Sequence, residues 1–259
     1  MIDLRVELQD QYCSGSVAVM QVAVPVTDLN RSPDGPRDRQ MIFGEGFEVH
    51  GQHESWAYGK TVNTRYVGFV AAASLRLDQS TNHYVRTQWA TLYHAPDFKT
   101  ADCLTIPRGA LLHVTGENGK FWQTPDGFVP KQQVTDEHGS DPAAVALGFV
   151  GTPYLWGGNS SSGIDCSGLM QAAYLACGMT CQGDSDLMEA HLVGETPTKP
   201  VRNQLYFWNG HVAMTISETE LVHANANAMA VTVEGIDDAI HRIEAGGDGP
   251  VTRRLKIPI

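Results

Sequence analysis

The sequence predicts a multidomain fold with two small all-β barrels followed by an α+β domain. Three observations indicate this: a repeat in the first half, short apolar runs separated by turn residues, and a change from strand-like to helix-like patterns near residue 136. A chain of 259 residues is long enough for two or three domains that each bury a core. With 42% hydrophobic and 18% charged residues, its composition is typical of a globular protein.

The first half of the chain contains an internal repeat. Leu29, Pro33, Asp34 and Gly46 recur 63 residues later as Leu92, Pro96, Asp97 and Gly109, and Gly68-Phe69-Val70 recurs 59 residues later as Gly127-Phe128-Val129. The shared order and nearly constant offset favour a duplicated unit over chance. The smaller second offset predicts a four-residue deletion between Gly46 and Gly68.

Each copy of the repeat has the pattern of short strands. Apolar runs at residues 47–49 and 111–114 follow glycines, and turn residues such as Asn118-Gly119 separate the runs. About 60 residues of this kind indicate a small barrel. We expect a first barrel with an N-terminal extension at residues 1–79 and a second at 80–137, with the polar residues 78–88 linking them.

Residues 138–259 are expected to form the α+β domain. Ser140 or Asp141 followed by Pro142 is a helix-start signature, and predicts a helix up to Val150. A second helix is predicted over residues 166–176, ended by Gly178. Strands are predicted at residues 204–208, 211–216, 220–224 and 229–234, so the helices come first and an antiparallel sheet follows.

The charge of the chain excludes several classes of partner. There are 18 Lys and Arg against 29 Asp and Glu, a net charge of −11. Binding to nucleic acid or to an anionic membrane needs a basic surface, so neither is expected. No apolar run is long enough to span a membrane, and the acidic start at residues 1–7 is unlike a secretion signal, so we expect a cytoplasmic protein. The sequence leaves the oligomeric state open and is compatible with a monomer.

Cys166 is the strongest candidate for a reactive residue. Five cysteines in a chain of this length do not suggest a disulfide framework. Cys166 falls at the expected start of the second helix, where unpaired N–H groups and the helix dipole favour the thiolate. The alternative is an inert core cysteine, because free cysteines are often buried.

A thiolate nucleophile needs an imidazole partner, and two of the ten histidines lie in a suitable context. His211 opens a strand after Asn209-Gly210, and His223 lies on the next strand. A two-residue turn at Glu218-Thr219 would place the two imidazoles on opposite faces, because strand side chains alternate. Both reach one site only if the connection has an odd length or contains a bulge.

A metal site is the competing interpretation of these three residues. Structural zinc sites bring closely spaced ligand pairs, whereas Cys166, His211 and His223 are at least 12 residues apart. We therefore expect no metal, and the sequence indicates no organic cofactor. Cys13, Cys103, Cys177 and Cys181 are expected to pack in the core.

The candidate residues occur within four motifs: Thr152-Pro153-Tyr154-Leu155-Trp156-Gly157-Gly158, Asp165-Cys166-Ser167-Gly168-Leu169, Gly210-His211-Val212-Ala213 and Leu221-Val222-His223-Ala224. Together they resemble the NlpC-type murein cysteine peptidases, a papain-like family, over residues 140–259. The two β units are similar to bacterial SH3-like domains, a similarity carried by residues 40–45 and 66–70. The family motif has Gly-Asp before its Leu-x-Phe strand, whereas this chain has Asn203-Gln204, which leaves the local turn in question.

This resemblance implies a γ-D-glutamyl–L-diamino acid endopeptidase of murein-peptide recycling that requires a free N-terminal L-Ala. Cys166 would be the nucleophile, present as a thiolate paired with protonated His211. His223 would orient His211, and Tyr154 would hydrogen-bond near the oxyanion. The substrate ammonium would be held by Asp165, Ser167, Tyr66 and Glu45. A helix N-cap is the alternative role for Asp165, a core aromatic for Tyr154, and a solvated loop acid for Glu45.

Two other functions remain open from the sequence. The same machinery could transfer the acyl group to an amine acceptor instead of water. A catalytically inactive murein-binding module is the non-enzymatic alternative, and the joint presence of Cys166, His211 and His223 argues against it.

Overall fold

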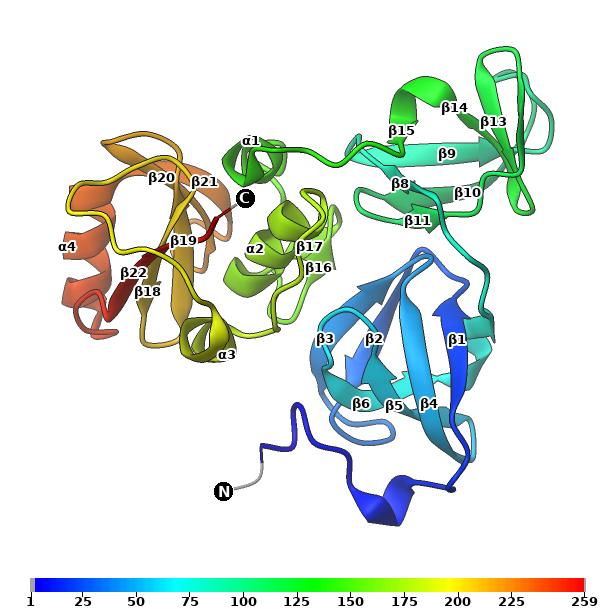
Figure 1. Cartoon of the computed structure of the whole chain (residues 1–259), viewed down its shortest axis with the longest axis horizontal. Coiled ribbons are helices and arrows are strands. Elements are labelled where there is room, and N and C mark those ends of the chain that lie inside the picture. The colour runs from blue at the N-terminus through cyan, green and yellow to red at the C-terminus, as the bar shows by residue number, and fades with distance from the viewer. Residues whose placement is uncertain (1–2, 259) are drawn as a thin grey trace. The chain divides into compact units, whose positions relative to one another are not determined.

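The computed structural model describes residues 3–258. It divides into two compact units, Met1–Glu137 and His138–Ile259 (Figure 1). Within the described residues, no helix combines the length and the apolar character that crossing a lipid bilayer requires.

The first part of unit 1 is a seven-stranded antiparallel sheet in the order β3-β2-β6-β5-β4-β1-β7. Its strands are β1 (Ala18–Val22), β2 (Val26–Asn30), β3 (Arg37–Ile42), β4 (Gly46–His53), β5 (Trp56–Thr61), β6 (Val67–Ala71) and β7 (Leu75–Leu77), with 3-10 helices η1 (Asp10–Tyr12) and η2 (Ala72–Ser74). Its core includes Val22, Leu29, Phe47 and Val70, all fully buried. Burial of these apolar side chains is the main favourable contribution to folding of the sheet.

The second part of unit 1 has a five-stranded sheet, β10-β9-β14-β13-β12, and a three-stranded sheet, β11-β8-β15. Its elements are β8 (His83–Val85), β9 (Trp89–Tyr93), β10 (Asp102–Pro107), β11 (Leu111–Leu112), β12 (Gly116–Asn118), β13 (Phe121–Thr124), β14 (Gly127–Pro130), β15 (Val134–Thr135) and the 3-10 helix η3 (Lys131–Gln133). Phe43, from the end of β3, is fully buried in this second core beside Leu92 and Val129. The two parts therefore share packed side chains.

Strand pairing agrees with the repeat. Asn30 of β2 pairs with Phe69 of β6, and Tyr93 of β9 pairs with Phe128 of β14. These pairs are related by the two sequence offsets, 63 and 59. The order β3-β2-β6-β5 thus recurs as β10-β9-β14-β13.

The predicted deletion within the repeat has the wrong size. Gly44 and Gly109 follow equivalent strands with positive φ values of 84° and 86°, a conformation that glycine adopts without strain. Gly109 is therefore the counterpart of Gly44, not of Gly46, and the offset there is 65. The connection before β10 is two residues longer than the one before β3, and the later shortening removes six residues instead of four.

The predicted linker at residues 78–88 is also incorrect in part. Residues 83–85 form β8, the central strand of the three-stranded sheet, and Val85 is fully buried. This short strand is hard to recognise in the sequence, because Val85 is its one buried residue and polar residues such as His83 and Arg86 surround it.

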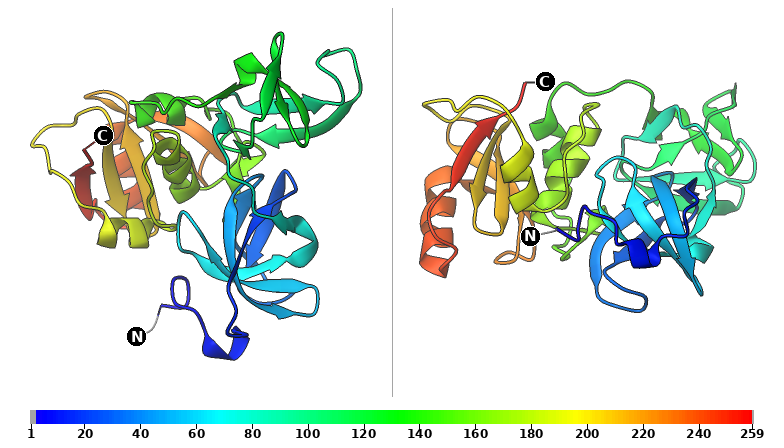
Figure 2. Two further views of the ribbon diagram at one scale, coloured as in Figure 1. Left: turned by 45° about the vertical axis from the view of Figure 1, so that its right-hand side comes forward. Right: turned by 60° about the horizontal axis from the view of Figure 1, so that its bottom comes forward.

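Unit 2 is built on a five-stranded antiparallel sheet in the order β21-β20-β19-β18-β22 (Figure 2). Its elements are α1 (Pro142–Leu147), β16 (Asn159–Ser160), β17 (Gly163–Ile164), α2 (Cys166–Leu175), α3 (Ser185–His191), β18 (Gln204–Trp208), β19 (His211–Thr215), β20 (Glu220–Asn225), β21 (Ala230–Gly235), α4 (Ile236–Gly246) and β22 (Arg253–Lys256). Leu169 of α2 packs with Phe207 and Met214, whereas Ile243 of α4 packs with Trp208. The two helices therefore cover opposite faces of the sheet.

The predicted strands of unit 2 match β18 to β21 within two residues. The helix predicted to reach Val150 ends at Leu147 and continues as hydrogen-bonded turns. The expectation that all helices precede the sheet is wrong, because α4 follows β21 and the chain then returns as β22.

Candidate active site

Cys166 is the first residue of α2 and is 7% exposed. Asp165 is the N-cap, and its Oδ1 accepts a hydrogen bond of 2.6 Å from the backbone N–H of Gly168. Such a cap satisfies one of the unpaired donors in the first helical turn. The thiol lies at the end of the helix where an anion is favoured.

The Asp165 carboxylate is held by donors of its own chain. Oδ1 also accepts from the hydroxyl of Ser167 at 3.0 Å, and Oδ2 accepts from the backbone N–H of Gly157 at 3.0 Å. Asp165 and Ser167 are both buried. The N-cap interpretation is therefore correct, and a role of these two residues in holding a substrate ammonium stays a prediction.

His211 is placed by a tight turn between β18 and β19. Trp208 pairs with His211 across the turn, and Gly210 has a φ of 75°, in the left-handed region. The Cys166 Sγ atom lies 4.0 Å from the carbonyl oxygen of Gly210. The thiol thus lies beside the residue that precedes His211.

The two histidines point to the same face of the sheet. Met214 pairs with Val222 across β19 and β20, and the Ile216 N–H donates to the Glu220 carbonyl in the same register, which leaves a three-residue connection at residues 217–219. The two-residue turn at Glu218-Thr219 is therefore wrong, and the stated condition of an odd connection is met. His211 Nε2 lies 2.9 Å from His223 Nδ1.

Two residues that the sequence analysis missed lie beyond His223. His223 Nε2 is 3.1 Å from Glu234 Oε2, and Arg242 binds both oxygens of that carboxylate, at 2.6 and 2.9 Å. Glu234 lies on β21 and shares a face with His223, because Leu221 pairs with Glu234. Arg242 comes from α4, so the unpredicted helix supplies the last member of this row of side chains.

The electrostatics of this row favour a neutral imidazole pair. Burial, together with smaller effects of His223 and Arg242, lowers the pKa of His211 to about 3. Burial lowers the pKa of His223 to about 4, although the Glu234 carboxylate opposes this effect. Hydrogen bonds from Arg242 lower the pKa of Glu234. Both shifts favour an uncharged His211 at neutral pH, and the imidazolium that the resemblance implies stays a prediction.

Tyr154 borders a cavity of about 290 Å³ next to His211. Residues Asn225, Asn227, Arg242 and Asp248 supply polar groups to its walls. Burial raises the pKa of the Tyr154 hydroxyl, and the nearby Cys166 and Asp165 raise it further. Tyr154 therefore stays protonated and able to donate a hydrogen bond close to the thiol.

Tyr66 and Glu45 belong to the first sheet of unit 1. Tyr66 is 2% exposed and packs in the core of that sheet. Glu45 is also buried, and it accepts a 2.9 Å hydrogen bond from the backbone N–H of Ile42. Burial raises the pKa of Glu45 to about 7, against the effect of Ile42 and Arg39. The alternative of a solvated loop acid is therefore wrong for Glu45, and its contact with substrate stays a prediction.

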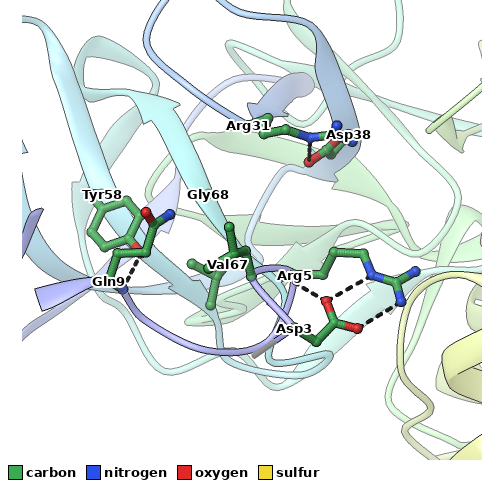
Figure 3. Close-up of a pocket in the computed structure, with 9 residues that line it drawn as sticks. Asp3, Arg5, Gln9, Arg31, Asp38, Tyr58, Val67 and Gly68 are labelled. Atoms are coloured by element: carbon green, nitrogen blue, oxygen red, sulfur yellow. Dashed lines mark hydrogen bonds and ion pairs between the residues drawn. The ribbon is translucent and has the colours of Figure 1, made fainter. Parts of the chain in front are cut away.

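Another cavity of about 290 Å³ in unit 1 lies between the N-terminal segment and the first sheet (Figure 3). Its charged residues pair with one another, Arg5 with Asp3 and Arg31 with Asp38. Neither Glu45 nor Tyr66 lines it.

Asn203 and Gln204 build the turn that the family motif left in question. Asn203 has a φ of 66°, a left-handed conformation that Asn tolerates better than most residues, and its Oδ1 accepts from the backbone N–H of Ala143 at 2.8 Å. The Gln204 Oε1 accepts from the backbone N–H of Val201 at 3.3 Å. The departure from Gly-Asp is therefore accommodated before β18.

Cysteines and possible metal ligands complete the description of the site. None of the five cysteines, Cys13, Cys103, Cys166, Cys177 and Cys181, forms a disulfide; Cys177 and Cys181 are buried, Cys13 is partly buried and Cys103 is exposed. The expected core position is therefore wrong for Cys103. Over residues 3–258, no group of three or more His, Cys, Asp or Glu side chains is arranged to hold a metal ion.

Two family models match the chain. The NlpC/P60 family matches residues 151–242, and the bacterial dipeptidyl-peptidase SH3 domain matches residues 29–75. The first match contains Cys166, His211 and His223, and the second contains Glu45 and Tyr66.

Curated relatives support the same assignment. Dipeptidyl-peptidase 6 of Lysinibacillus sphaericus is 26% identical over 230 residues, which cover 77% of this chain and 84% of that protein. The gamma-D-glutamyl-L-lysine dipeptidyl-peptidase of Bacillus cereus is 31% identical over 127 residues, which cover 46% of this chain and 36% of that protein.

Solved structures share the fold. An NlpC/P60 family protein from Bacillus cereus superposes with a TM-score of 0.74 at 19% identity, over 85% of this chain and 95% of that one. An NlpC/P60 endopeptidase from Photobacterium damselae gives a TM-score of 0.60 at 14% identity, over 97% of this chain and 73% of that one. Taken together with the site geometry, the two family matches identify in this chain an NlpC/P60 domain preceded by a bacterial SH3 domain.

Proposed function

We propose that the protein is a cysteine endopeptidase that hydrolyses the γ-D-glutamyl–L-diamino acid bond of murein peptides with a free N-terminal L-Ala. The diamino acid is diaminopimelate, and the role is recycling of murein peptides in the cytoplasm. One observation carries the proposal: Cys166 begins α2 beside Gly210, and His211 next to it is hydrogen-bonded to the buried His223.

The reaction begins from a thiol and a neutral imidazole. His211 accepts the proton of Cys166 as the sulfur attacks the γ-glutamyl carbonyl carbon. The backbone N–H of Cys166 and the hydroxyl of Tyr154 stabilise the oxyanion, and one such donor typically lowers the barrier by about 3–4 kcal/mol. His211 then donates the proton to the leaving amine. Water attacks the resulting thioester with His211 as base, which releases the L-Ala-γ-D-Glu product and restores the thiol.

A buried carboxylate supports the requirement for a free amine. Ionised Glu45 is unfavourable in its buried position, as its raised pKa reflects. A substrate ammonium adds a second positive charge to that of Arg39 and so favours the ionised carboxylate, whereas an acylated amine does not. We propose that Tyr66, Asp165 and Ser167 are also substrate-binding residues.

The names of the relatives support the bond and the direction of cleavage. The Bacillus cereus relative is named for a γ-D-glutamyl bond to a diamino acid, lysine. Both relatives are named dipeptidyl-peptidases, enzymes that release two residues from an N-terminus.

Mass spectrometry of peptide digests tests this proposal. L-Ala-γ-D-Glu-diaminopimelate is incubated with the wild type, and its N-acetylated form is incubated in parallel. We expect release of the L-Ala-D-Glu dipeptide from the free peptide alone, and none with the C166A control. Equal cleavage of both peptides contradicts the amine requirement, and cleavage by C166A contradicts the role of the thiol.

A further inference from the structure

We propose that Glu234, held by Arg242, is a positioning residue that fixes the tautomers of both active-site imidazoles. In this arrangement the Nδ1 atom of His211 is kept without a proton, ready to accept one. The inference rests on the proposed use of His211 as the base. Neither the four motifs of the sequence nor the expected triad includes Glu234 or Arg242.

The hydrogen bonds form a continuous row from β19 to α4. His211 Nε2 lies 2.9 Å from His223 Nδ1, and His223 Nε2 lies 3.1 Å from Glu234 Oε2. Arg242 donates to Oε2 from Nη2 at 2.6 Å and to Oε1 from Nε at 2.9 Å. Because His223 is completely buried, these neighbours satisfy both of its ring nitrogens.

The donors and acceptors in this row follow from the carboxylate. An ionised carboxylate can only accept hydrogen bonds, so His223 Nε2 carries its proton and donates to Glu234. In a neutral imidazole the other nitrogen is then an acceptor, so His223 Nδ1 accepts from Nε2–H of His211. Nδ1 of His211 is left without a proton. The Glu234 carboxylate, which reaches His211 only through His223, thus determines which nitrogen of His211 can accept a proton.

Arg242 keeps the carboxylate in the form that this role requires. Its two hydrogen bonds fix the plane of the Glu234 carboxylate, in the fork geometry that a guanidinium makes with a carboxylate. The same pairing lowers the pKa of Glu234, so the group stays ionised at neutral pH. The four side chains of the row come from four different elements: His211 from β19, His223 from β20, Glu234 from β21 and Arg242 from α4.

The row does not transfer a proton to Glu234 during the reaction. The thiol proton moves to Nδ1 of His211, and the imidazolium keeps its Nε2–H bond to His223. Glu234 offsets part of the new positive charge, and Arg242 weakens that effect. Orientation of the two rings is therefore the expected contribution of Glu234, more than its charge.

Two substitutions separate orientation from charge. E234L removes the acceptor, so neither tautomer of His223 is favoured. E234Q removes the charge and the hydrogen bond between Arg242 Nε and Oε1, but an amide oxygen at the Oε2 position still accepts from His223 Nε2–H and from Arg242 Nη2. E244L is the matched control, since Glu244 is exposed on the same helix.

Nitrogen-15 NMR of histidine-labelled full-length protein reads the tautomers, with His211 and His223 assigned from H211Q and H223Q spectra. We expect both rings as the Nε2–H form in the wild type, E234Q and E244L, and a mixture in E234L. We expect kcat on the peptide to fall roughly 10- to 100-fold in E234L at an unchanged KM, as when a partner that orients a functional imidazole is lost. E234Q should stay within a few-fold of the wild type.

Three results overturn the inference. One is an NMR spectrum that shows the Nδ1–H form of either ring in the wild type, a measurement that does not depend on the folding of any variant. Another is an E234L protein with wild-type tautomers and kcat. The last is an E234Q protein that loses as much kcat as E234L while its tautomers stay intact, since charge would then be the important property. The NMR result is independent of the substrate, so it remains valid if the proposed peptide is not cleaved.

Discussion

Replacing Glu45 by Gln should stabilise the protein at high pH and leave it unchanged at low pH. The pKa of Glu45 rises from 4.5 to about 7 on folding, and each pKa unit corresponds to 1.36 kcal/mol. Between these values the folded state binds more protons than the unfolded state, so stability falls as the pH rises through this window. The ionised side chain therefore costs about 3 kcal/mol above pH 7.

Gln has nearly the same shape, and its oxygen can still accept from the Ile42 N–H. We expect E45Q to unfold at the same temperature as the wild type at pH 4, and at a clearly higher temperature at pH 8. Thermal unfolding of both proteins at half-unit steps from pH 4 to pH 8 measures the difference. A stability difference that does not change with pH would refute the reasoning. E45Q should also have a raised KM for the free-amine peptide, which separates stability from binding.

Three further substitutions test other parts of the structure. D165A should destabilise unit 2 by about 2–4 kcal/mol in urea unfolding, because it removes the N-cap acceptor of Gly168 and the acceptor of the buried Gly157 N–H; a loss below about 1 kcal/mol contradicts this. N203A should cost about 1–2 kcal/mol through its left-handed φ, as measured by the same method, whereas N203G should cost less, and the opposite order would be inconsistent with backbone strain. F43A should destabilise unit 1 by about 3–5 kcal/mol in urea unfolding, since Phe43 fills the second core, and an unchanged midpoint would contradict that packing.

The parts of the fold that the sequence predicts are those with strong local patterns. The strands of unit 2 have alternating or continuous apolar residues between clear turns. Helix α2 begins directly after a capping Asp and ends shortly before Gly178. The repeat was visible because Gly-Phe-Val recurs unchanged. The predicted size of the deletion was wrong because either Gly44 or Gly46 could be aligned with Gly109, and only the φ values show that Gly44 is the equivalent residue.

The elements that were missed have weaker local signals. Ile236, Ala239 and Ile243 of α4 have helical spacing, and two acids occupy its first turn, so this helix could have been found. By contrast, β22 is mostly charged and buries Leu255 by pairing with β18. That pairing depends on tertiary contacts that no local pattern reveals.

The residues of the candidate site also fall into two groups, those that local motifs reveal and those that only the tertiary structure reveals. Cys166, His211 and His223 lie in motifs, so they could be named without coordinates. Glu234 resembles an ordinary acid near the exposed end of a strand, and its role depends on strand register and on a helix that returns to the sheet. Long-range relations of this kind are absent from the sequence pattern.

The connection at residues 217–219, between β19 and β20, has an odd number of residues, and this keeps His211 and His223 on the same face of the sheet. Inserting or deleting one residue at positions 217–219 would shift the pairing by one position. His223 would then turn towards α2 and leave its partner, although composition, motifs and most of the packing would be preserved. A homologue with every motif intact but an even loop would therefore fold like an enzyme and lack the residue that orients its base, a defect that only counting residues would reveal.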